Sequence, residues 1–343
     1  MARLPVALLG AGRLGAGHAR ILAALPEAQL VAVADPRPEG RQLGERYGAR
    51  TIADPLEAIG DAAVRAVVIA TPTSSHAPLI EAAARAGKAI FCEKPVALDV
   101  ASTARALAAV RAGGVQLQLG FQRRFDAGFA EARRRIAAGE IGKIQLLHAV
   151  SCDPYPPSRE YILGCGGQFV DMAIHDIDMA RFLTASEISS VSASGAALGP
   201  QAEDFRAAHD WDTTVLTLRF ASGALGTIVN SRQAGYGYDI HTAVLGDSGG
   251  LKVGYERHTP ITRYDQGGAH HDYVPYFPER FAQAYAAELE TFVEAVRWGR
   301  DVSPTGDDGL LALQVALAAT ASARAGGQPV TVDYATDGDQ PAA

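Results

Sequence analysis

The sequence predicts two domains: an α/β domain with a doubly wound parallel sheet, then an α+β domain built on an open, largely antiparallel sheet. With 343 residues, the chain is longer than one ordinary domain. Short apolar runs alternate with helical patterns over the first third, which is typical of parallel strands joined by crossover helices. Later apolar runs follow one another across short turns, which favours antiparallel pairing.

The composition is that of a soluble globular protein, with 48% hydrophobic and 20% charged residues. A net charge of -7 without a basic stripe argues against a nucleic-acid partner. No uninterrupted apolar run reaches the roughly 18 residues of a membrane-spanning helix. The apolar run at residues 4–9 ends at a glycine with no cleavage-site pattern, so we interpret it as a strand and expect a cytoplasmic protein.

The three cysteines, Cys92, Cys152 and Cys165, are odd in number and widely spaced. This pattern fits neither a disulfide framework nor a paired-cysteine zinc site, so we expect buried free thiols. The run His270-His271-Asp272 matches no metal-ligand spacing, and we expect no metal.

A glycine motif follows the first strand, residues 4–9. It reads Gly10-Ala11-Gly12-Arg13-Leu14-Gly15, and a helical pattern begins within it. In this strand-turn-helix context, the first glycine permits a tight turn, the second lets a pyrophosphate approach the backbone, and the third lets the helix pack on the strand. We therefore expect a Rossmann dinucleotide site whose cofactor contacts come from Gly10, Gly12, Arg13, Leu14 and Gly15.

A second strand, residues 30–34, ends in Asp35, 20 residues past the last glycine. A carboxylate there accepts hydrogen bonds from both ribose hydroxyls and repels a 2′-phosphate, which favours NAD over NADP. Arg37 or Arg13 could instead turn toward a phosphate, although arginines just past a strand are more often solvated. We count Asp35 and Arg37 among the cofactor-binding candidates.

The next two strands, residues 64–70 and 89–92, end beside residues that bear polar groups. Ligands of doubly wound sheets gather beyond such carboxyl ends, so we add Thr71, Pro72, His76, Glu93 and Lys94 as cofactor candidates. His76 alone fits better as a capping or packing residue, because it opens a helix after a turn. Lys94, followed by Pro95, is expected to project toward the nicotinamide, the alternative being a surface salt bridge to Glu93.

The first domain is expected to close with a strand at residues 115–121, which gives an NAD-binding domain over residues 1–122. A substrate-binding and oligomerisation domain would cover residues 123–333, followed by a frayed tail over 334–343. Its two long helices, near residues 281–296 and 310–323, would leave one sheet face uncovered. Such faces commonly become subunit interfaces, so we expect a homo-oligomer, a dimer or tetramer.

Residues 166–178 predict a helix that carries chemistry. Val170, Ile174 and Ile177 have the spacing of a buried stripe, while Asp171 and His175 are four residues apart on a neighbouring face. Asp171 falls in the first turn, where the helix dipole favours its charge, and it could orient the imidazole. The alternative is a capping acid beside a buried structural histidine.

Together, the glycine motif, Asp35, Glu93-Lys94-Pro95 and the Gly166-to-His175 segment resemble the Gfo/Idh/MocA oxidoreductase family over residues 3 to about 333. Segments 120–126, 171–183 and 236–240 resemble the inositol 2-dehydrogenases of that family. Gln122, and Cys165 through Gln168, depart from the usual pattern of these enzymes and bear on which polyol is used.

The resemblance implies catalytic roles for His175 as general base, Lys94 as the group that polarises the reacting hydroxyl, and Asp171 as a substrate ligand that orients the histidine. It also implies that Arg123, Asp153 and Tyr236 line the substrate pocket. The expected reaction is NAD-dependent oxidation of myo- or scyllo-inositol, in a crevice between the domains. An aldose 1-dehydrogenase, a related sugar oxidoreductase or a non-catalytic sugar- and NAD-sensing regulator remains as an alternative.

An alcohol gives up hydride to a nicotinamide only as its proton leaves. The chemistry therefore needs a base near neutral pKa and a positive group beside the forming alkoxide. His175 and Lys94 would supply these two groups without a metal.

Overall fold

The computed structural model describes residues 2–254 and 257–334. The chain divides into two compact units. Unit 1 runs to Phe125 and also includes Gln283–Leu313, and unit 2 comprises Asp126–Ala282 and the described residues from Gln314 onward. Most of the expected tail, from residue 335 on, lies outside the described residues.

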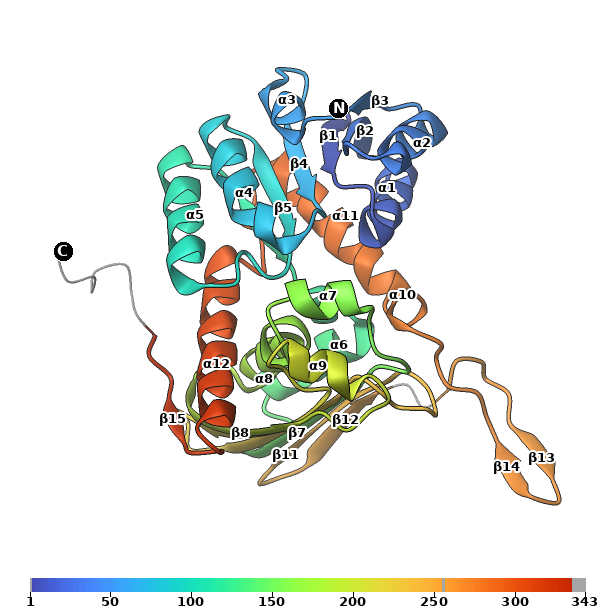
Figure 1. The fold of residues 1–343 in the computed structure, drawn as a ribbon, viewed down its shortest axis with the longest axis vertical. Helices are drawn as coiled ribbons and strands as arrows, with labels where there is room; N and C mark the ends of the chain where they lie inside the picture. The colour runs from blue at the N-terminus through green and yellow to red at the C-terminus, as the bar shows by residue number, and fades with distance from the viewer. Residues whose placement is uncertain (1, 255–256, 335–343) are drawn as a thin grey trace. The chain divides into compact units, whose positions relative to one another are not determined.

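Unit 1 contains a six-stranded parallel sheet in the order β3-β2-β1-β4-β5-β6, as the sequence predicted (Figure 1). The order reverses between β1 and β4, which is where doubly wound sheets bind ligands beyond their strand ends. The strands are β1 (Leu4–Leu9), β2 (Ala28–Ala34), β3 (Arg50–Ile52), β4 (Ala66–Ile69), β5 (Ala89–Glu93) and β6 (Leu117–Gly120).

The helices between these strands include two that the sequence did not predict, α2 and α3, together with β3. The reason is composition: α2 buries only Gly40, Leu43 and Gly44, so it presents no apolar stripe that periodicity could detect. The helical elements are α1 (Arg13–Ala24), α2 (Pro38–Tyr47), α3 (Pro55–Gly60), η1 (Thr73–Ser75), α4 (His76–Arg85), α5 (Val100–Gly113) and η2 (Gln122–Phe125).

The long helix α11 (Ala282–Trp298) belongs, from Gln283 on, to unit 1. Its residues Leu289, Phe292 and Val293 join the same hydrophobic core as the first strands, and the Phe292 ring lies 5.9 Å from that of Phe91. The expected domain 123–333 therefore differs from unit 2. An amphipathic stripe shows that a helix packs against a core but does not show which core.

Unit 2 is built on a seven-stranded sheet in the order β12-β11-β7-β10-β9-β8-β15. β7 and β10 run parallel and the other adjacent pairs are antiparallel, so the sheet is largely antiparallel, as predicted. The strands are β7 (Ile144–Cys152), β8 (Ile188–Ala196), β9 (Thr213–Phe220), β10 (Leu225–Ser231), β11 (Asp239–Gly246), β12 (Gly250–Gly254) and β15 (Val330–Thr331), with a separate hairpin of β13 (Arg263–Asp265) and β14 (Gly268–His270).

Helices of unit 2 cover one face of this sheet, and Figure 1 shows none over the other face. On the uncovered face Leu245, Leu146 and Leu225 are cross-strand neighbours on β11, β7 and β10, and all three are exposed.

The helices of unit 2 are α6 (Ala127–Ala137), α7 (Arg159–Gly164), η3 (Phe169–Ala173), α8 (Ile174–Thr184), α9 (Ala202–Ala207), α10 (Phe277–Arg280) and α12 (Gly306–Arg324), which enters unit 2 at Gln314. Among the residues described, no helix is long and apolar enough to cross a membrane.

Candidate functional site

The glycine turn after β1 has the geometry that a pyrophosphate requires. Gly10 has φ +96°, and a Cβ on it would lie 2.5 Å from the Ala70 carbonyl oxygen. A Cβ on Gly15 would lie 2.1 Å from the Gly10 oxygen, so both glycines are needed for close packing. A Cβ on Gly12, at the N-terminus of α1, would have Arg37 Nη2 as its nearest neighbour, at an ordinary contact distance of 3.9 Å. The turn therefore fits a dinucleotide, with the free N–H groups of α1 facing its phosphates.

Asp35 is an ionised carboxylate held at the end of β2. Its Oδ2 accepts from the Ala11 N–H (2.7 Å), while the Arg37 guanidinium donates to both carboxylate oxygens, at 2.9 and 2.8 Å. The hydrogen bonds from Arg37 lower the pKa of Asp35 to about 2, although burial opposes this shift. Arg37, which the sequence left open as a phosphate ligand, here pairs with Asp35, and its side chain is 56% exposed.

His76 is buried and fixes two neighbouring strand ends. Its Nδ1 lies 2.8 Å from the Pro95 carbonyl oxygen and its Nε2 lies 2.9 Å from the Thr71 carbonyl oxygen. Burial lowers the pKa of His76, although its hydrogen bonds to the two carbonyl oxygens oppose this shift. This favours the packing interpretation, because the ring nitrogens face main-chain carbonyls. Pro72 follows Thr71 and starts η1 as its N-cap residue.

Glu93, the last residue of β5, is 6% exposed, and its Oε1 lies 2.7 Å from the Nε2 of His18 on α1. From the sequence, a surface salt bridge between Glu93 and Lys94 was an alternative, and nothing indicated that His18 would be the partner of Glu93. Lys94 follows directly and is joined to Pro95 by a cis peptide bond. The buried side chain of Glu93 therefore lies at the end of β5, directly before Lys94.

The helix predicted at residues 166–178 begins with a π-helical turn, η3 (Phe169–Ala173), and continues as α8. Gly166 and Gly167 precede it with φ values of +86° and +91°. Val170, Ile174 and Ile177 are buried, as their spacing predicted, and His175 is partly buried. Asp171 lies inside the π turn, a feature that is frequent at functional sites and that sequence periodicity does not distinguish from an α-helix.

A buried arginine, Arg232, joins two of the predicted substrate ligands. Its Nη2 donates to Asp171 Oδ2 (2.5 Å) and its Nη1 donates to Asp153 Oδ2 (3.3 Å). Its Nε donates to the side-chain oxygen of Gln168 (2.7 Å), and Tyr161 donates to the other Asp171 oxygen (2.8 Å). Gln168, a departure from the family pattern, therefore supports the arginine.

The electrostatics of this group favour an ionised Asp171. Burial opposes the charge of Arg232, but Asp171 and Asp153 outweigh it and raise the pKa of the guanidinium. The negative charge of Asp171, together with burial, raises the pKa of Tyr161, so the tyrosine remains a hydrogen-bond donor. Arg232 was missed from the sequence because an arginine after a strand is usually solvated. Tyr161 was also missed.

The remaining predicted substrate residues lie in both units. Arg123 is almost fully buried, in η2 of unit 1. Tyr236 belongs to unit 2, is 53% exposed, and donates from its hydroxyl to Asp239 Oδ2 (2.9 Å). Their contact with a substrate stays a prediction.

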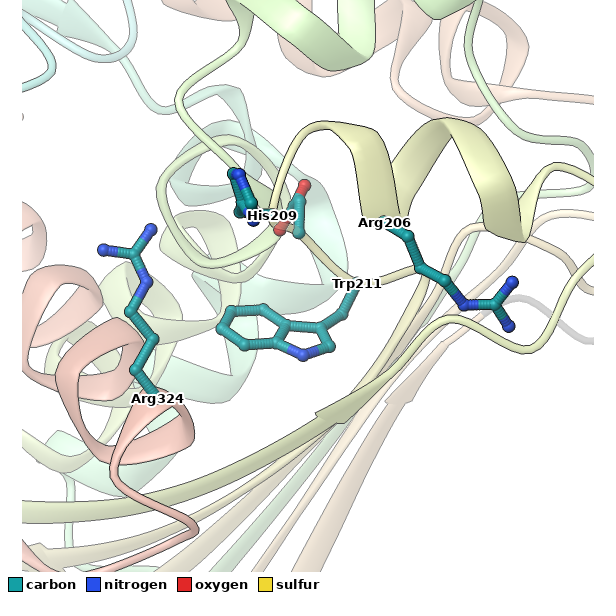
Figure 2. Close-up of a pocket in the computed structure, with 5 residues that line it drawn as sticks. Arg206, His209, Trp211 and Arg324 are labelled. Atoms are coloured by element: carbon teal, nitrogen blue, oxygen red, sulfur yellow. The ribbon is translucent and has the colours of Figure 1, made fainter.

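Figure 2 shows a pocket of about 610 Å³ in unit 2 that the sequence did not reveal. The Trp211 indole lies between the side chains of Arg324 and Arg206 in this view. None of the predicted site residues lines the pocket. It adjoins the candidate site because Asp210 accepts from the Gln168 N–H (3.0 Å) and the Trp211 ring lies 5.5 Å from that of Phe169.

The His270-His271-Asp272 run has no metal-site geometry. His270 Nε2 lies 3.1 Å from an Asp265 oxygen in the exposed hairpin, and the described parts of the chain hold no group of three or more potential metal ligands. Cys92, Cys152 and Cys165 are free and buried. Burial raises the pKa of the Cys152 and Cys165 thiols to about 11, so they are unreactive.

Comparison with protein families matches both parts of the chain. Residues 4–121 match the oxidoreductase family with an NAD-binding Rossmann fold, and residues 129–252 match the GFO/IDH/MocA C-terminal domain. The chain belongs to the GFO/IDH/MocA oxidoreductase family. It is therefore an NAD-dependent oxidoreductase, as the motifs predicted, and NAD is the cofactor that its glycine turn and Asp35 fit.

Relatives within this family match almost the full length of the chain. It is 41% identical to scyllo-inositol 2-dehydrogenase (NAD(+)) of Bacillus subtilis, covering 95% of this chain and 96% of the relative. It is 43% identical to an inositol 2-dehydrogenase of Rhizobium meliloti, covering 92% and 95%. The structure of scyllo-inositol dehydrogenase from Lactobacillus casei with bound NAD(H) and scyllo-inositol superposes with a TM-score of 0.89, at 30% identity, covering 96% and 99%.

We predict that Arg232→Met lowers the free energy of unfolding by about 3–5 kcal/mol, because it leaves Asp171 and Asp153 buried without their cation. Arg206→Met is the matched control, since Arg206 is exposed and its guanidinium donates to a main-chain oxygen, that of Ala197, and not to a buried carboxylate. It should change stability by less than about 0.5 kcal/mol. Denaturant unfolding of both variants measures the difference, and equal midpoints would contradict the assigned pairing.

Proposed function

We propose that this protein oxidises one ring hydroxyl of a cyclic polyol, myo- or scyllo-inositol, to the corresponding ketone by transferring hydride to NAD. The observation that carries the proposal is the buried arrangement in which Arg232 holds both Asp153 and Asp171, the latter one turn before His175. This cluster offers carboxylate oxygens to hydroxyl groups and has the base on the next turn. The names of the relatives support the same substrate class.

In the proposed reaction, the carbon-bound hydrogen leaves as hydride and the hydroxyl hydrogen leaves as a proton, so the C–O single bond becomes a carbonyl. NAD, when bound, accepts the hydride. His175 takes the proton, and the Lys94 ammonium donates a hydrogen bond to the same oxygen and stabilises its developing negative charge. Asp171 and Asp153 accept hydrogen bonds from neighbouring hydroxyls and orient the ring, with Arg123 and Tyr236 proposed as further ligands.

The polar cluster also explains selectivity for a polyhydroxylated ring. A substrate that lacks a hydroxyl leaves a buried acceptor unpaired, at a cost of about 1–3 kcal/mol for each group. Simple alcohols should therefore be poor substrates. Aldopyranoses have a similar ring of hydroxyls and are the nearest competitors.

We also propose a preference for NAD over NADP. Asp35 is ionised at the end of β2, and its carboxylate would repel a 2′-phosphate. The Arg37 guanidinium is already paired with this carboxylate, which supports a role in holding Asp35 and not in binding phosphate.

The assembly is proposed to be a homo-oligomer through the uncovered sheet face of unit 2. Its row of exposed leucines, Leu245, Leu146 and Leu225, supports a second copy as the partner, because a symmetric interface pairs the same patch on both subunits. We propose that the enzyme works in the cytoplasm, which the three free cysteines support.

The substrate assignment predicts NADH formation, followed by absorbance, with myo- or scyllo-inositol under saturating NAD. kcat/KM for an inositol should exceed that for D-glucose. Lys94→Ala and His175→Ala should each lower kcat by about 10²- to 10⁴-fold while the protein still binds NADH. If an aldose is oxidised and neither inositol is, an aldose dehydrogenase replaces this proposal.

The cofactor assignment predicts a higher kcat/KM with NAD than with NADP, and a smaller ratio for Asp35→Ser, because serine removes the charge that repels the 2′-phosphate. Steady-state kinetics with both cofactors measure the ratio. Comparable values in the unsubstituted enzyme would show that Arg37 or Arg13 receives the phosphate.

The interface assignment predicts that Leu146→Arg reduces the particle mass measured by light scattering, because it places a charge in the centre of the leucine row. Leu56→Arg is the control, since Leu56 is 54% exposed on α3 of unit 1. The control should keep the mass of the unsubstituted protein. An unchanged mass for both variants would place the interface elsewhere.

A further inference from the structure

Glu93 is fixed from two sides inside unit 1. His18 lies 2.7 Å from its Oε1, and because an ionised carboxylate can only accept, Nε2 of His18 carries the hydrogen of this bond. On the other side, a Cβ at Gly120 of β6 would lie 3.0 Å from Oε2. Glycine at position 120 therefore lets the carboxylate lie against β6.

A second carboxyl group, Glu288 of α11, belongs to the same cluster. It is fully buried, and within the part of the chain that is described neither of its oxygens has a hydrogen-bond partner. It lies one turn after Tyr285, whose ring is 6.0 Å from that of His18. Burial and the negative charge of Glu93 raise the pKa of Glu288 well above its ordinary value. A buried carboxyl group with neither a donor nor a cation beside it is neutral.

The other titratable groups near Glu93 add no second negative charge. Burial raises the pKa of the Cys92 thiol and so disfavours the thiolate, and the His76 imidazole is not negative in either of its ordinary protonation states. Tyr285 contacts His18 through its aromatic ring. Lys94, the residue after Glu93 in the chain, is a cation and adds no negative charge. Glu93 is thus the single negative charge among Glu93, Glu288, Cys92 and His76.

We propose that His18 and Glu288 are positioning residues for Lys94 and act through Glu93. Lys94 follows Glu93 directly, so a hydrogen bond that fixes the Glu93 side chain also fixes the end of β5 from which Lys94 extends. Glu288 contributes by remaining neutral, since an ionised Glu288 would repel Glu93 and weaken its bond to His18. The inference rests on the proposed role of Lys94 at the substrate oxygen.

The first arm of the test measures kcat and KM in four variants. His18→Phe keeps an aromatic ring between Phe91 and Tyr285 but removes the donor, and it should lower kcat about ten- to a hundredfold with little change in KM for NAD. His18→Gln restores a donor and should recover most of the loss. Glu288→Gln mimics the neutral acid and should keep kcat. Glu290→Gln, an exposed position on the same helix, is its matched control.

The second arm measures the unfolding temperature against pH and requires no substrate. Because the folded-state pKa of Glu288 lies above its ordinary value of 4.5, the unsubstituted protein loses stability as pH rises above about 4.5 toward the raised pKa. Glu288→Gln does not titrate. Its unfolding temperature should therefore exceed that of the unsubstituted protein by a margin that grows from pH 5 to pH 9, whereas Glu290→Gln should show a constant difference.

Normal kcat in His18→Phe, or parallel pH curves for Glu288→Gln and Glu290→Gln, would overturn the inference. If the unsubstituted enzyme oxidised no polyol while the second arm gave the expected curves, the proposed function and the role given to Lys94 would fail. The neutral state of Glu288 would then stand by itself. The two failures are therefore distinguishable.

Discussion

The candidate site in unit 2 depends on one buried cation. Arg232 is 5% exposed, and its guanidinium bonds three side chains. Asp171 lies in η3, Gln168 directly precedes η3, and Asp153 directly follows β7. Two buried carboxylates this close together would otherwise repel each other, and one of them would take up a proton. The arginine offsets both negative charges and fixes both carboxylates, and under the proposed function both accept hydrogen bonds from a polyol.

In unit 1, by contrast, the buried carboxylate of Glu93 is paired with a histidine. Its Oε1 lies 2.7 Å from the Nε2 of His18, and burial together with the negative charge of Glu93 raises the pKa of the second carboxyl group, Glu288. Glu93, at the end of β5 and next to Lys94, is therefore held by a histidine and not by an arginine. The contrast predicts different responses to substitution: removal of the cation would leave two charges unpaired in unit 2, whereas removal of the donor in unit 1 would release the end of a strand.

Much of the fold and several site residues could be predicted because their signals are local. Parallel β1 and β2 follow from apolar runs around the Gly10–Gly15 turn, and Asp35 follows from its place at the end of β2. Signals were absent for α2, which has no apolar stripe, and ambiguous for α11, whose stripe fits either core. The π turn at Asp171 was missed because Val170, Ile174 and Ile177 have the spacing of a regular α-helix, which gives no sign of a wider turn.

The sequence by itself determined the doubly wound first domain, the largely antiparallel second sheet, the dinucleotide turn and the identity of the residues that carry reactive groups. Each of these rests on steric or periodic rules that act within a few residues. Only the tertiary structure decided that Arg232 joins Asp171 to Asp153, that Glu93 bonds His18, and that Glu288 is buried with no donor among the described residues. These pairings join residues 61 to 79 positions apart along the chain, and which charges meet at such separations depends on how the strands and helices pack.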